Sequence, residues 1–152
     1  DKQKEPTVAA IKGFLGKKVT NVNRLADNDV MVVNDKNEII ILIEIEEVKM
    51  SPKKLLGDIF SREMCNRFAV RINKENKYFD VSSKTRLIVA GVVPNTGSGQ
   101  KKIRDIILPR LKNFSVPSDA VKTDQINILT GRDISETIDQ LKDEMKSIFG
   151  MG

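Results

Sequence analysis

Histidine and tryptophan are absent from this chain of 152 residues, and cysteine and tyrosine occur once each. Without histidine there is no Ser-His-Asp or Cys-His triad, and most zinc sites and histidine-based nuclease motifs are excluded. The single cysteine, Cys65, cannot form an internal disulfide, and its apolar helical surroundings in the sequence predict inert core packing. Catalysis would depend on Asp, Glu, Lys, Ser, Thr or Tyr. A metal would have oxygen ligands, which favours Mg²⁺, Mn²⁺ or Ca²⁺.

Long apolar runs are absent as well. No stretch approaches the ~18 residues needed to span a bilayer, and the N-terminus DKQKEPTV does not have the pattern of a signal peptide. We therefore expect a cytoplasmic protein that does not enter a membrane. A hydrophobic content of 39% is sufficient for a core, so residues 1–152 are expected to form one domain, alone or within a longer chain.

The charge balance is mildly basic, with 26 Lys and Arg against 21 Asp and Glu and a net charge of +5. This excess is compatible with nucleic acid binding, although charge alone favours a basic protein that binds none. With one tyrosine and no tryptophan, a single-strand-binding surface built on aromatic stacking has little support.

Hydrophobic spacing predicts four helices. They cover residues 7–19, 51 to at least 65, 101–114 and 133–148. Ser51-Pro52 is a strong start signal, because serine caps a helix and proline suits its first position. Asp133 with Glu136 has the spacing of a capping box. Pro109 is expected to kink or divide the third helix.

Strands are expected at 29–33, 39–47, 85–93 and 125–129. The first two should form an antiparallel hairpin around the turn NDKN. The third is apolar on both faces, which is typical of a central strand. Residues 68–72 fit either a helix or a short strand. The order of the elements predicts an α/β domain with a mixed sheet.

Two carboxylates, Glu44 and Glu46, lie in the strongly apolar segment EIIILIEIEEVK. Burying an unpaired charge is costly, so a partner is expected, and a divalent metal is the leading candidate. Side chains alternate along a strand, so these two glutamates share one face. The alternative is that they lie at a sheet edge and pair with Lys or Arg.

The register of the hairpin decides which residue joins them. If the turn pairs Val33 with Glu38, then Asp29 lies opposite Leu42 and is the diagonal neighbour of Glu44, roughly 7–8 Å away. Two carboxylate side chains at these positions could reach one ion. Phosphodiester hydrolysis uses such a cation to activate water and to offset developing charge.

These residues resemble the PD-(D/E)XK, or restriction-endonuclease-like, superfamily of metal-dependent nucleases. Asp29 matches its aspartate and Glu44 its second acid, while Glu46 stands in the lysine position, as in some restriction enzymes, and Asn28 replaces the usual proline. The resemblance implies an α/β fold with a three-layer core, a central mixed β-sheet flanked by helices. It also implies Mg²⁺ or Mn²⁺ as cofactor, with Asp29, Glu44 and Glu46 as metal ligands, and DNA as partner.

The missing lysine has several candidate replacements. The segment Glu47-Val48-Lys49 reads literally as acid-x-lysine but lies on the opposite face from Glu44, and we rank it second. Lys49, Lys53 or Lys54 could supply the positive charge from beyond the strand. The pair Lys53 and Lys54 also suits phosphate contacts, because its helix begins just after the acidic strand.

A second basic pair, Lys101 and Lys102, follows the loop at 94–99. This loop is faintly similar to a phosphate-binding loop but lacks the GK[ST] ending, so a surface loop is the favoured interpretation. Contact of the two lysines with a DNA phosphate, or a nucleotide-binding module, are the alternatives.

Together these features predict a Mg²⁺-dependent DNA endonuclease, active as a homodimer or as part of a larger enzyme. Asp29, Glu44, Glu46 and Lys49 would be its catalytic residues, and Lys53, Lys54, Lys101 and Lys102 would bind nucleic acid. The alternative is a catalytically inactive domain of the same fold that binds nucleic acid or a protein partner. Its main support is Glu46 in the lysine position.

Overall fold

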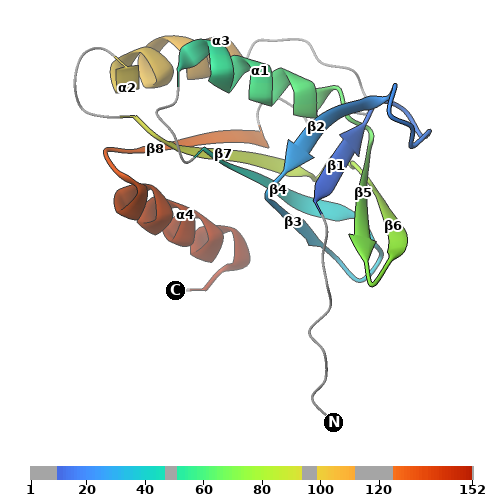
Figure 1. Ribbon diagram of the computed structural model, residues 1–152. Helices are drawn as coiled ribbons and strands as arrows, with labels where there is room; N and C mark the ends of the chain where they lie inside the picture. The colour runs from blue at the N-terminus through green and yellow to red at the C-terminus, as the bar shows by residue number, and fades with distance from the viewer. Residues whose placement is uncertain (1–9, 47–50, 94–98, 112–124, 152) are drawn as a thin grey trace.

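The computed structural model describes residues 10–46, 51–93, 99–111 and 125–151, which form two four-stranded sheets and three helical segments (Figure 1). The strands are β1 (Ile11–Phe14), β2 (Arg24–Asn28), β3 (Val30–Val33), β4 (Ile39–Glu46), β5 (Arg67–Ile72), β6 (Glu75–Asp80), β7 (Arg86–Val92) and β8 (Ile126–Gly131). The helices are α1 (Pro52–Glu63), a continuous segment of α2 (Gly99–Lys102), π-helical Ile103–Ile107 and α3 (Leu108–Leu111), and α4 (Ile134–Phe149). None of the described helices has the length and hydrophobicity to cross a membrane.

The mixed sheet has the order β3-β4-β7-β8. The β3–β4 pair is antiparallel, as predicted, while β4, β7 and β8 are parallel to one another. The strand predicted at 85–93 is the inner strand β7, whose residues Leu87–Gly91 are buried. Helix α1 and the α2–α3 segment lie on one face of this sheet and α4 on the other (Figure 1). The expectation of an α/β fold with helices on both faces of a mixed sheet is thus confirmed.

The second sheet, β2-β1-β5-β6, is antiparallel and was not predicted. The prediction of a helix at 7–19 is wrong for the described residues, because Ile11–Phe14 forms strand β1. Pairing with β2 and β5 outweighs the helical spacing, which is ambiguous over so short a segment. Gly13 permits close packing there, since a Cβ atom would come within 2.7 Å of Cys65 Sγ. Residues 68–72, left open by the sequence, belong to strand β5.

The hairpin register also differs from the prediction. Val33 lies opposite Ile39, a bulge follows between Val32 and Val33, and Val30 lies opposite Ile43. The shift amounts to two residues beyond the bulge, so the side chains from Ile41 to Glu46 keep their expected faces. At the bulge itself the faces change: Ile39 packs with Leu42, and Ile40 packs with Ile41 and Ile43 in the other cluster. Continuing the observed register places Asp29 opposite Glu44 itself.

The helix boundaries follow their capping residues. Ser51 Oγ accepts a hydrogen bond from Lys54 N (3.2 Å) at the start of α1, as predicted, but the helix ends at Glu63 rather than beyond Cys65. Residues 99–111 are continuously helical, and a π-helical turn lies just before Pro109. Asp133 caps α4 by accepting from Glu136 N (2.9 Å), although the Glu136 carboxylate bonds to Arg132 rather than completing the capping box.

The main core lies between α1 and the two sheets and includes Cys65, whose thiol pKa is raised to about 12 by burial, consistent with an inert packing role. One acidic residue shares this interior. Glu63 is 2% exposed, and neither of its carboxylate oxygens has a hydrogen-bond partner among the residues described. Burial therefore raises the Glu63 pKa from 4.5 to about 7.

Glu63 is expected to make stability fall as pH rises. Its pKa is higher in the folded protein than in the unfolded chain, so its stabilising contribution is complete below about pH 4.5 and is lost as pH rises through about 7. Glu63→Gln should flatten the dependence of the unfolding free energy on pH between 5 and 8, by up to about 3 kcal/mol. Urea unfolding followed by circular dichroism measures this. Equal pH slopes for the wild type and the variant would contradict the assignment.

Candidate active site between strand β4 and helix α1

A row of charged side chains on α1 faces a row of carboxylates on β4. Lys54, Asp58 and Arg62 are spaced four residues apart and share one face of the helix. Lys54 Nζ lies 2.6 Å from Glu46 Oε2, and Arg62 Nη2 forms an ion pair with Glu44 Oε2. The first turn of α1 therefore lies over the end of β4 and its last turn over position 44.

Arg62 is the most deeply buried member of this row, with 3% of its surface exposed. Its Nε donates to Asn28 Oδ1 (2.7 Å), its Nη1 to the Asp58 carbonyl oxygen (2.8 Å) and its Nη2 to the Asp27 carbonyl oxygen. With the Glu44 ion pair added, one guanidinium connects β2, β4 and α1. Such a group is stable inside a protein only when its donors are satisfied, as they are here.

Asn28 extends this network to the hairpin. It is 6% exposed. Its Nδ2 donates to the carbonyl oxygens of Val30 (2.9 Å) and Ile43 (2.8 Å). The asparagine thus fixes the passage from β2 to β3 against β4 while its Oδ1 holds Arg62.

Asp29 follows at the break between these two strands. Its Oδ2 accepts a hydrogen bond from Ile45 N (2.7 Å), which anchors the carboxylate beside β4. The negative charge of Asp29 contributes to raising the pKa of Glu44. The structure therefore brings Asp29, Glu44 and Glu46 to one face of the hairpin.

The electrostatics of the site show an excess of negative charge. Burial raises the pKa of Glu44 to about 7; Arg62 opposes this shift, and Asp29 and Asp58 add to it. The pKa of Asp58 is also raised, by burial first and also by Glu46, again against Arg62. Four carboxylates thus face two cations, Lys54 and Arg62, and a further cation would relieve the repulsion.

The donor chemistry fits a hard cation. Asp29, Glu44 and Glu46 each use one oxygen in the contacts above, and the second oxygen of each has no hydrogen bond or ion pair to a described residue. Within the described ranges, no three Asp, Glu, Cys or His side chains are close enough to hold a metal by themselves. Mg²⁺ is commonly bound by one or two carboxylates together with water and substrate phosphate, so Asp29 and Glu44 suit it.

The basic residues predicted from the sequence divide into three groups. Lys54 is part of the site, and Lys53 is exposed beside it on α1. Lys101 and Lys102 are exposed on α2, which begins at the same edge of the mixed sheet as α1 (Figure 1). Lys49, with the alternative segment from Glu47, lies outside the described residues.

Sequence reasoning missed the role of Asp58 and Arg62. Their spacing with Lys54, four and eight residues along α1, was the available signal, because it predicts a charged stripe next to the buried residues Leu55 and Ile59. The role of Asn28 had no comparable signal. Its contact with Arg62 joins residues that are 34 positions apart.

Removing the buried guanidinium should destabilise the fold. Arg62→Ala is expected to cost about 3 kcal/mol, because it leaves the partly buried Glu44 and the Asn28 side chain without their partner. The matched control is Arg132→Ala, which removes an exposed ion pair with Glu136 (2.9 Å) and should cost less than about 1 kcal/mol. Chemical denaturation measures both. Equal losses of unfolding free energy in the two variants would show that the buried contacts of Arg62 do not stabilise the fold more than an exposed ion pair does.

Comparison with known proteins does not supply a relative. No family model matches this chain, and no curated protein or solved structure matches it either. The function of the site therefore has to be inferred from its own residues.

Proposed function

We propose that this protein is a metal-dependent deoxyribonuclease of the restriction-endonuclease-like type, which hydrolyses phosphodiester bonds in DNA. The observation that carries the proposal is the position of Lys54, whose Nζ lies 2.6 Å from Glu46 Oε2. The helix after the acidic strand thereby supplies the amine that the strand itself does not carry at position 46. The β3–β4 hairpin leads into α1, and β7 pairs parallel with β4 after the β5–β6 hairpin.

Each residue then has a chemical role. Asp29 and Glu44 would hold Mg²⁺ or Mn²⁺, which when bound supplies an activated water and offsets charge on the phosphate. Glu46, oriented by Lys54, would position the attacking water. The Lys54 ammonium would stabilise the negative charge that develops on the phosphoryl oxygens.

Other basic residues would hold the substrate. Lys53 on the first turn of α1, and Lys101 and Lys102 on α2, are exposed and suit contacts to backbone phosphates. Lys49 keeps its predicted catalytic role within the proposal. A homodimer would bring two such sites to the two strands of a duplex, because one site cuts one strand at a time.

A second candidate function is a non-catalytic domain of the same fold that binds nucleic acid or a protein. One observation favours it: Glu44 and Glu46 each already have a cationic partner, Arg62 and Lys54. Ion pairs of this kind can hold a helix on a sheet without any metal. The two candidates differ in one measurable respect, which is the cleavage of DNA.

A plasmid-nicking assay with Mg²⁺ or Mn²⁺ tests the proposal. The wild type should convert supercoiled plasmid to the nicked form. Glu44→Gln should lower the rate on the order of 100-fold or more, because it removes a ligand charge. Lys54→Met should lower it on the order of 10- to 100-fold, by loss of charge stabilisation.

The matched control is Lys142→Met, which removes an exposed lysine on α4 whose described partner is Asp139 (3.3 Å). Its nicking rate should equal that of the wild type. Activity that survives Glu44→Gln would defeat the site assignment. A wild type that binds DNA but is inactive with both ions would establish the non-catalytic candidate instead.

A further inference from the structure

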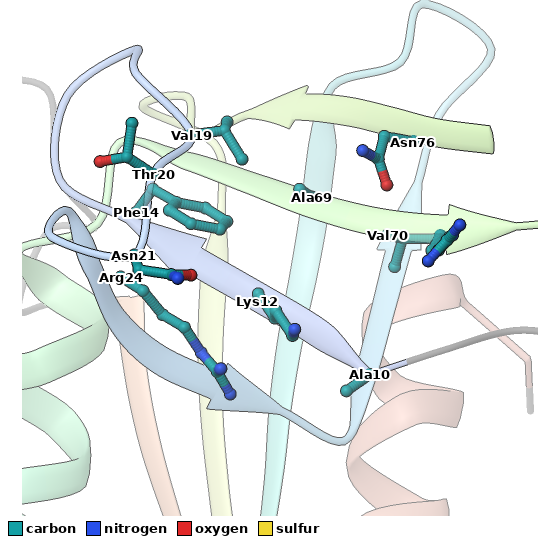
Figure 2. Close-up of a pocket in the computed structure, with 11 residues that line it drawn as sticks. Ala10, Lys12, Phe14, Val19, Thr20, Asn21, Arg24, Ala69, Val70 and Asn76 are labelled. Atoms are coloured by element: carbon teal, nitrogen blue, oxygen red, sulfur yellow. The ribbon is translucent and has the colours of Figure 1, made fainter. Parts of the chain in front are cut away.

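The antiparallel sheet β2-β1-β5-β6 has one face toward the core and one face away from it. Phe68, Val70 and Phe79 are buried on the core side. On the opposite side, strand β1, the loop before β2, and strands β5 and β6 line a hollow of about 310 Å³. Figure 2 looks into this hollow, with Lys12 near its centre.

Three cations line the hollow: Lys12, Arg24 and Arg71. None of the described residues that line it is a carboxylate, and its uncharged polar groups include the side-chain amides of Asn21 and Asn76. Its inner surface includes Phe14, which is 4% exposed, and Ala69, which is 8% exposed. A lining of ammonium, guanidinium and amide donors without acidic acceptors is suited to an anion with several oxygens.

Lys12 is the least satisfied of these groups. It is half-buried, and the strand register places it between Asp27 on β2 and Ala69 on β5. The Asp27 carboxylate is already held by Arg24, whose Nη2 lies 2.6 Å from each of its oxygens. Lys12 therefore has no ion pair among the described residues, and the small Ala69 side chain leaves space beside it. An anion in the hollow would supply the missing counter-charge.

Arg71 lies on the other side of the hollow. Its one hydrogen bond to a described residue is a long one, from Nε to the Lys74 carbonyl oxygen (3.4 Å). Its two terminal nitrogens have no hydrogen bond to the part of the chain that the structure describes, and a guanidinium suits a phosphate in a two-point contact. Lys12 and Arg71 thus bring an ammonium and a guanidinium to the same hollow.

The hollow adjoins the candidate active site through β2. The Asp27 side chain is bound by Arg24, which lines the hollow, while the Asp27 carbonyl oxygen accepts a hydrogen bond from Arg62 of the charged row on α1. One residue of β2 therefore contacts both sites. A ligand long enough to cross this strand would engage both, which favours a polymer over a small phosphate compound.

We propose that this hollow binds a backbone phosphate of a nucleic acid strand through Lys12 and Arg71. The binding goes beyond the proposed nuclease function, because it requires neither a metal nor cleavage. It gives the chain a second nucleic acid contact on a different sheet from Glu44. The contact is independent of base sequence, since it reads only the phosphate.

The test is duplex binding in EDTA, measured by fluorescence anisotropy of a labelled DNA at several salt concentrations. The double variant Lys12→Ala, Arg71→Ala should bind on the order of 10-fold more weakly, and its salt slope should be smaller by about 2, one for each lost contact. Arg71→Ala alone changes an exposed residue and should show about half of the slope change. Lys142→Ala, Lys146→Ala on α4 is the control with equal charge loss and should bind like the wild type.

Unchanged affinity and slope in the double variant would overturn the proposal, as would an equal loss in the α4 control. A third outcome would also overturn the proposal. If the hollow binds inorganic phosphate or a nucleotide, but the double variant binds the duplex as the wild type does, the hollow is a site for a small phosphate compound. Glu44→Gln separates this inference from the nuclease function. That variant should bind the duplex in EDTA like the wild type even where nicking is lost.

Discussion

The buried guanidinium of Arg62 is the interaction on which the arrangement of the candidate active site depends. It is 3% exposed and bonds to β2 through Asn28 and Asp27, to β4 through Glu44 and to its own helix through Asp58. Backbone hydrogen bonds hold each sheet together, and Leu55 and Ile59 of α1 are buried in the main core. The two ion pairs, Arg62 with Glu44 and Lys54 with Glu46, connect α1 to β4 at both ends of the helix.

The same contacts create the electrostatic character of the site. Partial burial of Glu44 and Asp58 raises the pKa of both acids, and Asp29 adds to the shift of Glu44 and Glu46 to that of Asp58, although Arg62 lies beside them. A protein selected only for stability gains little from such an arrangement, because apolar residues of similar volume are often equally or more stable than a buried ion pair. Residual negative charge, and carboxylate oxygens that have no contact with a described residue, are what a hard cation requires. We therefore favour a catalytic role for this site over a purely structural one.

Much of the mixed sheet could be predicted, because its signals are local. The NDKN turn, the Ser51-Pro52 start of α1 and the apolar strand β7 each depend on neighbouring residues in the sequence. Alternation along β4 predicted the shared face of Glu44 and Glu46, and a two-residue shift in register could not change it. The bulge beside Val33 that caused this shift has no clear sequence signal.

The antiparallel sheet was missed because β1 spans only Ile11–Phe14 and is defined by its pairing with β2 and with the distant β5. Arg62 was underrated for the same reason, since its partners Asp27, Asn28 and Glu44 lie on other elements.

The proposed function requires Asp29 and Glu44 to form one site for a divalent cation. A crystal of the protein grown with Mn²⁺ and measured for anomalous scattering locates the ion independently of activity. We expect a peak with oxygens of both Asp29 and Glu44 at roughly 2.0–2.6 Å. A Mn²⁺ position elsewhere, or an Arg62–Glu44 ion pair that persists with no ion beside it at saturating Mn²⁺, would show that these two residues do not form the site.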